Sequence, residues 1–375
     1  MKIGILTLSL KVNYGGILQA YALQHILQKI GHEVEVIDKP HHYKMPIWKM
    51  ALLFPGRAFK KYICKSNEGI FREWVHNKRY PVLSRYTEQF LNDNINRYET
   101  AGYPIVEKGR YDCIIVGSDQ IWRRKYHKKI TPVYLDFTKD WNIKRIAYAV
   151  SFGTDIWEYN DEETRICKTL ASSFNAISVR ESSGVDLCRQ YLNVEATHVL
   201  DPTMLLNKDE YIRLFKDKNI KKSEGNLLCY ILDPSEESSQ VIKQVRDYLG
   251  LTPFSVIAKN FDSYQGDDDN IQPPVEEWLR GFYDAEFVIT DSFHASVFSI
   301  LFNKPFLVIK NKSRGVARIE SLLNEFEIPN RVVKDPKTAH IIALEQIDYE
   351  CVNAILNREK KQSVSFLKMS LTSND

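Results

Sequence analysis

Short runs of apolar residues alternate with helical repeats along most of this chain. Residues 3–8 form an apolar run typical of a buried strand, and residues 17–30 carry apolar side chains at helical spacing. Gly31 ends that helix, and residues 33–38 are expected to form a second strand. A strand, a helix and a second strand in this order predict a parallel βαβ unit.

The same alternation continues to about residue 215 and starts again near residue 226, after the charged stretch 216–225. Further strands are expected at 112–116, 145–150, 176–179, 226–232, 253–257, 286–290 and 305–309, and further helices at 162–174, 236–249, 274–282, 292–301 and 347–367. We therefore expect an α/β protein with an N-terminal domain, 1–215, a C-terminal domain, 226–340, and a helical tail, 341–375.

Residues 40–110 interrupt this alternation with a region rich in Lys, Arg, Trp and Tyr. Short amphipathic helices are expected at 47–54 and 69–77. A mixture of basic and aromatic residues is typical of segments that lie on membranes, but an ordinary solvated face has the same composition. Both interpretations stay open for Trp48, Lys49, Lys60, Lys61, Arg72, Trp74, Lys78 and Arg79.

Composition excludes several classes of protein. The 375 residues are 44% hydrophobic and 26% charged, with a net charge of +3, and no dense basic block indicates a nucleic-acid partner. The six cysteines form no CxxC pair, which argues against a disulfide framework and a structural zinc site. Without a long apolar run or a signal-peptide pattern, we expect a cytoplasmic protein.

Polar residues follow three of the expected strands in the first domain. Because the carboxyl ends of parallel strands meet at one edge of a sheet, these residues should line a shared crevice. They are residues 117–120, 151–153 and 180–181.

Several side chains at this edge have chemistry suited to a ligand. Asp119 and Gln120 can hydrogen-bond sugar hydroxyls, and Trp122 offers an apolar face. Asp119 could instead cap a helix. Arg180 is either an anion ligand or the partner of Glu181.

The stretch FVITDSFHASVFSI, residues 287–300, combines a strand with the start of a helix. Asp291 and Ser292 are good N-cap residues, so His294 falls in the first helical turn. Free N–H groups at a helix N-terminus favour phosphate or carboxylate, and an imidazole beside them can move protons. His294 could also simply cap or pack there.

A glycine turn, NYGG at 13–16, joins the first strand to the first helix. Glycine lets a ligand approach the backbone closely. The turn is not GxGxxG, so the fingerprint of a dinucleotide site is absent.

Five motifs taken in order resemble the polysaccharide pyruvyl transferase family. They are NYGGILQAYAL, DCIIVGSDQIW, SVRE, HVLDPT and FVITDSFHASVFSILFNKPF, and the resemblance spans about residues 3–325. It implies an α/β, GT-B-like fold with two Rossmann-like domains facing each other across a cleft. It also implies transfer of the enolpyruvyl part of phosphoenolpyruvate to a sugar, usually forming a pyruvate ketal and releasing phosphate, with no metal and no other cofactor.

The resemblance assigns roles to residues on both sides of the cleft. The family pattern of acid, Arg, apolar residue and His falls on residues 291–294, where Ser292 replaces the Arg and His294 is implied to bind phosphoenolpyruvate and act in acid–base catalysis. Another cation must then complete the anion site, and Lys259 and Lys310 are weaker candidates than the arginines. The expected donor site is Arg180, Ser292, His294, Ala295, Arg314 and Arg318. The expected acceptor site is Asn13, Tyr14, Gly15, Gly16, Ser118, Asp119, Gln120 and Trp122, with Asp119 as the base.

The family acts on intermediates of surface polysaccharides such as capsule or exopolysaccharide, and a hexose such as galactose on a lipid diphosphate is the expected acceptor. A lipid-linked acceptor implies peripheral contact with the inner face of the cell membrane. Two other functions stay open: a GT-B glycosyltransferase that uses a nucleotide sugar, and a non-catalytic scaffold that binds carbohydrate. The missing Arg at position 292 is consistent with the second.

Overall fold

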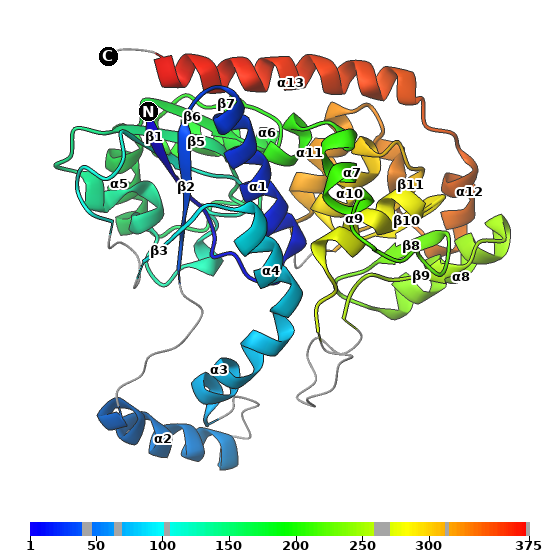
Figure 1. Ribbon diagram of the computed structural model, residues 1–375, viewed down its shortest axis with the longest axis horizontal. Coiled ribbons are helices and arrows are strands. Elements are labelled where there is room, and N and C mark those ends of the chain that lie inside the picture. The colour runs from blue at the N-terminus through cyan, green and yellow to red at the C-terminus, as the bar shows by residue number, and fades with distance from the viewer. Residues whose placement is uncertain (40–46, 64–69, 101–105, 259–270, 312–314, 373–375) are drawn as a thin grey trace.

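The computed structural model describes residues 1–39, 47–63, 70–100, 106–258, 271–311 and 315–372. Two α/β domains lie side by side, and each contains its own parallel sheet (Figure 1). The expectation of an α/β protein with two parallel-sheet domains is confirmed.

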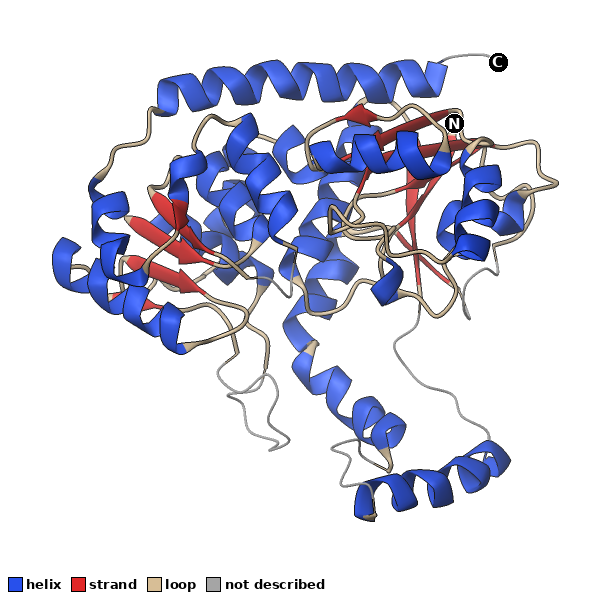
Figure 2. Ribbon diagram, turned by 180° about the vertical axis from the view of Figure 1, so that it is seen from behind, coloured by secondary structure: helices blue, strands red, loops and turns tan. Residues whose placement is uncertain are grey.

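The first sheet has seven strands in the order β3-β2-β1-β4-β5-β6-β7, all parallel. Its middle strands are buried on both faces because helices cover both sides, and this explains their uninterrupted apolar sequences (Figure 2). The strands are β1 Lys2–Leu6, β2 Glu33–Asp38, β3 Arg97–Glu99, β4 Cys113–Val116, β5 Lys144–Val150, β6 Ala176–Val179 and β7 Thr197–His198.

The second sheet has five parallel strands in the order β12-β11-β10-β8-β9. Its central strand, β10, is completely buried and leads directly into helix α10. The strands are β8 Leu227–Tyr230, β9 Pro253–Phe254, β10 Phe287–Thr290, β11 Phe306–Ile309 and β12 Val332–Val333.

The α-helices connect and cover these strands. In the first half they are α1 Tyr14–Lys29, α2 Ile47–Tyr62, α3 Arg72–Leu83, α4 Arg85–Asn94, α5 Asp161–Ala171 and α6 Ser182–Leu187. In the second half they are α7 Lys208–Lys216, α8 Glu236–Leu249, α9 Val275–Asp284, α10 Phe293–Leu301, α11 Val316–Glu325, α12 Ala339–Leu344 and α13 Tyr349–Thr372. Short turns of 3-10 or π helix lie at Arg124–Tyr126, Thr131–Tyr134, Asp136–Thr138, Cys188–Leu192, Pro202–Leu205, Pro329–Arg331 and Pro336–Thr338.

Two helices near the expected domain boundaries pack in ways the sequence pattern did not indicate. Helix α7 lies at the end of the expected N-terminal domain, 1–215, but it packs on the second domain. There, Tyr211 lies edge-on to Phe298, with 4.9 Å between ring centroids. Helix α13 starts on the second domain and returns to the first, where Ser363 Oγ accepts from Leu200 N at 3.0 Å (Figure 2). The last helix therefore ties the two domains together.

Helices α2 and α3 form an arm that extends away from both sheets (Figure 1). Both helices are longer than the sequence pattern indicates, and each contains a proline, Pro55 in α2 and Pro81 in α3. Within the described residues, no helix is both long enough and apolar enough to cross a membrane.

Candidate functional site

The site lies where the loops after the first sheet's strands meet the start of helix α10. Strand β4 leads into Ser118 and Asp119, and β6 leads into Arg180. From the second domain, β10 leads through Asp291 into α10, which brings His294 to the same place. These contacts bring two of the expected strand ends, 117–120 and 180–181, next to the first turn of α10.

His294 occupies the first turn of α10 and is only 7% exposed. Ser292 caps the helix, since its Oγ accepts from Ala295 N at 3.5 Å. The imidazole lies directly against Gly15 of the first domain, where an added Cβ would stand 2.0 Å from Nδ1. Only glycine fits at position 15 while the domains hold this arrangement.

Asp201 joins the two halves of the site and is absent from the residues expected from sequence. Its Oδ2 accepts from Arg180 Nη1 at 2.6 Å and from Ser118 Oγ at 2.9 Å, and lies 3.7 Å from His294 Nε2. Its Oδ1 accepts from the backbone and hydroxyl of Thr203 at 3.0 and 2.7 Å. Burial opposes ionisation, but His294 and Arg180 outweigh it and hold the pKa of Asp201 well below its ordinary value.

The sequence signal for Asp201 was weak. It follows a two-residue strand and precedes Pro202, a pattern that any helix cap or turn can show. Its connection to the site depends on the fold, because Arg180 and His294 lie far from it in sequence.

Two buried arginines flank the ring of Phe293. The guanidinium carbon of Arg180 lies 4.3 Å from the ring centroid and that of Arg318 lies 5.5 Å from it. Burial and the charge of Arg180 lower the pKa of Arg318 to about 10, so both remain charged at neutral pH. Burial also opposes the charge of Arg180, but Asp201 and Asp119 raise its pKa. Two charged guanidinium groups that share one ring as a neighbour make this part of the site favourable for an anion.

Only part of the guanidinium group of Arg180 is hydrogen-bonded within the described residues. One nitrogen, Nη1, is used by Asp201, whereas Nε and Nη2 have no hydrogen-bond acceptor within the described parts of the chain. Asp119 Oδ1 lies 3.8 Å from Nη2. The alternative partner, Glu181, instead accepts from Ser151 Oγ at 2.9 Å and Phe152 N at 2.8 Å.

Asp119 and its neighbours form the first-domain wall of the site. Asp119 has a φ of 70° and accepts from Gln120 N at 2.8 Å, so it closes a tight turn. A Cβ at Gly16 would stand 3.7 Å from Asp119 Oδ2, which places this carboxylate beside the glycine turn. Gln120 holds Arg123, whose Nη1 donates to its Oε1 at 2.7 Å.

Two expected acceptor residues belong to the core instead. Trp122 is fully buried, stacks on Tyr134 at 4.5 Å and donates from Nε1 to Val133 O at 3.2 Å. Tyr14 is also fully buried and donates to Pro273 O at 2.7 Å, which anchors the second domain. Trp122 has no face for a sugar, because its apolar surface is packed inside the first domain. The ring of Tyr14 is buried against Trp278 of the second domain, with 5.5 Å between ring centroids.

The other expected residues are placed as follows. Asn13 caps α1, accepting from Gly15 N at 3.2 Å. Lys310 pairs with Glu320 at 2.9 Å. Arg314 and Lys259 lie outside the described residues. Within the described chain, no three His, Cys, Asp or Glu side chains are arranged to hold a metal ion.

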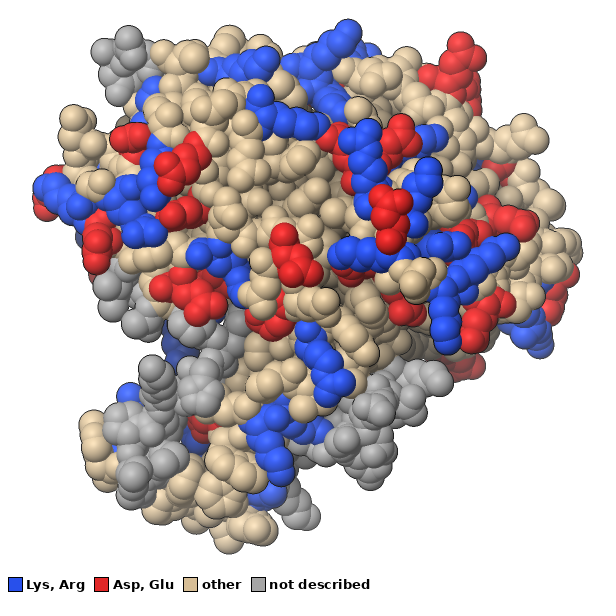
Figure 3. All heavy atoms as spheres, viewed as in Figure 1, with Lys and Arg blue, Asp and Glu red and all other residues tan. Residues whose placement is uncertain are grey.

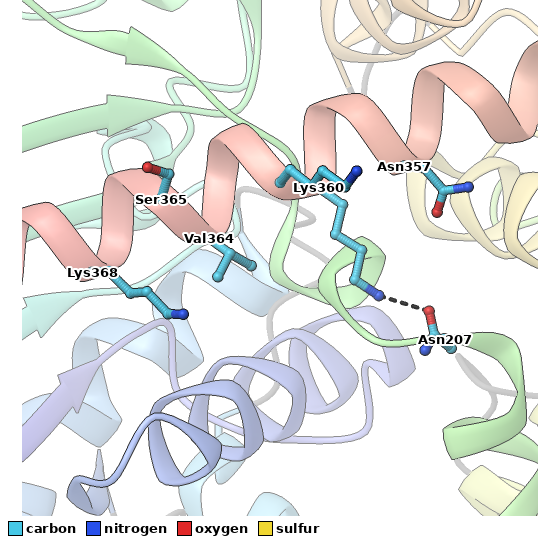
Figure 4. Close-up of a pocket in the computed structure, with 7 residues that line it drawn as sticks. Asn207, Asn357, Lys360, Val364, Ser365 and Lys368 are labelled. Carbon is cyan, nitrogen blue, oxygen red and sulfur yellow. Dashed lines mark hydrogen bonds between the residues drawn. The ribbon is translucent and has the colours of Figure 1, made fainter.

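A separate hollow of about 550 Å³ lies along α13 (Figure 4). Its polar contact is between Lys360 Nζ and Asn207 Oδ1 at 2.8 Å. We place the functional site at His294 and Asp201 instead, because the hollow is lined by surface lysines and amides without a buried charged group. It is lined by Asn207, Asn357, Lys360, Lys361, Val364, Ser365 and Lys368.

Residues 13–313 match the model of the family described as polysaccharide pyruvyl transferase. Among solved structures, the fold is similar to Arabidopsis thaliana UGT89C1 complexed with quercetin, at 8% identity and a TM-score of 0.50, covering 98% of this chain and 99% of that one. It also matches Neisseria meningitidis UDP-GlcNAc 2-epimerase bound to UDP-GlcNAc, at 12% identity and a TM-score of 0.48, covering 100% of both chains. No curated protein matches the sequence.

Proposed function

Because this chain belongs to the polysaccharide pyruvyl transferase family, we propose that it transfers the pyruvyl group of phosphoenolpyruvate to two hydroxyls of one sugar. The product is a cyclic pyruvate ketal, and phosphate is released. The acceptor is a hexose such as galactose in a lipid-linked intermediate of a surface polysaccharide, reached from the cytoplasmic face of the membrane. Phosphoenolpyruvate acts as a co-substrate, and the reaction uses no metal.

The observation that carries this proposal is the pair of buried arginines beside His294. Phosphoenolpyruvate has a phosphate and a carboxylate on a small frame, and guanidinium groups bind both with forked hydrogen bonds. Arg180 and Arg318 flank one ring, and the N-terminus of α10 starts beside them. These cations supply the charge that the family's Arg would bring at position 292.

The chemistry follows from the neighbouring ionisable groups. His294 gives a proton to the methylene carbon, which becomes a methyl group and leaves C2 electrophilic. The first sugar hydroxyl attacks C2 as Asp119 takes its proton. The bond from C2 to the phosphate oxygen then breaks, the second hydroxyl closes the ring, and its proton leaves with the phosphate.

Ligand-induced thermal stabilisation tests the donor site. Phosphoenolpyruvate at about 100 times its dissociation constant should add about 2.7 kcal/mol to the free energy of unfolding. His294→Ala should lose this shift, whereas His340→Ala, a histidine of α12 that stacks on Tyr248, should keep it. Stabilisation only by uridine or cytidine nucleotide sugars would contradict pyruvyl transfer and favour glycosyl transfer.

Phosphate release in the presence of a galactose-containing acceptor tests the reaction itself. Wild type and His340→Ala should release phosphate, and His294→Ala should not. Equal phosphate release by His294→Ala would remove it from the mechanism. If the protein binds phosphoenolpyruvate but releases no phosphate from it in the presence of lipid-linked sugars, the protein is a binding scaffold.

A further inference from the structure

Helix α2 has a stripe of exposed apolar side chains along one face. Trp48, Leu52, Phe59 and Tyr62 are 66%, 72%, 60% and 72% exposed. Their spacing of four, seven and three residues places them on the same side of an α-helix. Large apolar side chains exposed in a continuous row mark an interaction surface rather than ordinary surface scatter.

The other side of α2 is already used by the arm itself. Both Nη atoms of Arg57 donate to the carboxylate of Glu73 in a forked pair, at 2.6 and 2.7 Å. Phe54 packs edge-on against Phe71 with 4.7 Å between ring centroids. These contacts fix the rotation of α2 on the arm, so the stripe faces outward.

Positive charge is concentrated on the same helix. The sequence of α2 contains four basic residues and no acid, although the whole chain has a net charge of only +3. The side chains of Lys49 and Lys61 are exposed, and on α3 the Nζ of Lys78 lies 5.5 Å over the exposed ring of Trp74. Figure 3 shows Lys and Arg atoms along the arm, with little acidic surface beside them.

This combination fits one partner. A helix with aromatic residues near both ends, an apolar stripe and flanking lysines is typical of segments that lie in the headgroup region of an anionic bilayer. Sixteen residues with four cations are too few and too charged to cross a membrane. A second copy of the chain is a poor fit, because a two-fold contact would bring two positively charged helices together.

We propose that the arm of α2 and α3 binds the surface of a membrane rich in anionic phospholipid. Helix α2 lies in the plane of the interface, with Trp48, Leu52, Phe59 and Tyr62 inserted between lipid chains and the lysines at the phosphates. The binding itself is independent of pyruvyl transfer. Its use, to hold the site near a lipid-linked sugar, rests on the proposed function.

Vesicle flotation of the full chain tests this surface. Wild type should float with vesicles that contain phosphatidylglycerol and much less with pure phosphatidylcholine. The triple variant Trp48→Ala, Leu52→Ala, Phe59→Ala should lower the partition coefficient by at least about tenfold. Lys49→Gln and Lys61→Gln should each lower it by about fivefold, and high salt should weaken binding by wild type.

A matched triple variant controls for the loss of apolar surface elsewhere. Ile341, Leu344 and Met369 are 52%, 60% and 61% exposed on α12 and α13, away from the arm. Their change to Ala should leave the partition coefficient within about twofold of wild type. Circular dichroism of both triple variants checks that the fold is retained.

Three results would overturn the proposal. Wild type does not float, the stripe variant floats like wild type, or wild type forms a dimer without lipid whereas the stripe variant is a monomer. The last would assign the stripe to a second copy of the chain. Stabilisation by phosphoenolpyruvate is measured on the same variants. If the stripe variant loses flotation and keeps this stabilisation, the arm and the donor site are separate, and failure of one assay leaves the other proposal standing.

Discussion

Replacing Asp201 by Asn tests the carboxylate that connects the two domains at the site. Asp201 is 1% exposed, and its Oδ2 accepts from Arg180 Nη1 at 2.6 Å. Asn keeps the size of the side chain but removes its charge, and its NH2 group would face the donors of Arg180 or Thr203. The guanidinium of Arg180, itself 5% exposed, would then be buried without its nearest counter-charge.

The expected cost follows from this burial. Removing one partner of a buried ion pair lowers the free energy of unfolding by about 3–5 kcal/mol. Ser118→Ala is the matched control, because it removes one hydrogen bond of 2.9 Å to the same oxygen, worth about 1.5 kcal/mol, and leaves the charge pair intact. Urea unfolding of the three proteins measures both differences.

Turnover separates a positioning role from a purely structural one. Asp201 holds His294 at 3.7 Å, and a misplaced general acid loses about 10²–10⁴-fold in rate. A variant with the stability and rate of wild type would refute this reasoning, and lost stability with unchanged turnover would limit Asp201 to folding.

Substitutions at three further positions test separate contacts. Gly15→Ala would place a Cβ 2.0 Å from His294 Nδ1, so phosphate release should fall by more than about tenfold. The circular dichroism spectrum should stay unchanged. Phosphate release at the wild-type rate would show that the imidazole can move away at no cost. Ser292→Ala removes the cap on Ala295 N and should lower the free energy of unfolding by about 1 kcal/mol, whereas Ser292→Gly should cost only a few tenths, by urea unfolding. Burial raises the pKa of Asp38 to about 6, above about 3.9 in the unfolded chain, so its contribution to stability is present below pH 4 and is lost as pH rises through 6. Asp38→Asn should therefore remove a decline of about 3 kcal/mol between pH 4 and pH 7, and an unchanged decline would contradict the assignment.

The sheets could be predicted from sequence because their strands are buried on both faces. Uninterrupted apolar runs mark such strands clearly, and β6 has the expected bounds. Strand β2, which mixes apolar and acidic residues, also has the expected bounds. Helix α8 also matches its expected bounds, since Ser235 caps its start and Gly250 ends it with a φ of 65°. Helix α2 was expected to be eight residues shorter, because Pro55 ordinarily ends a helical pattern.

The site could be predicted only in part. Arg180 was predicted as a candidate because it directly follows a strand, and His294 because it lies in the first turn of the helix after one; the topology brings such positions together. Asp201 was missed because its partners come from other strands and from the other domain. Trp122 lies in the core of the first domain, because an aromatic side chain has the same sequence signature in a core as at a ligand surface.

The two domains build the site jointly, and glycines at their contacts make this possible. A Cβ at Gly315 would stand 1.9 Å from Gly153 O, so the start of α11 touches the loop after β5 directly. The contact places Arg318 of α11 beside the ring of Phe293. In the same way, the lack of a side chain at Gly15 leaves room for the imidazole of His294. Because the cations and the imidazole are nearly fully buried in this arrangement, the proposed function requires the domains to separate before the proposed donor can enter and to close again around it.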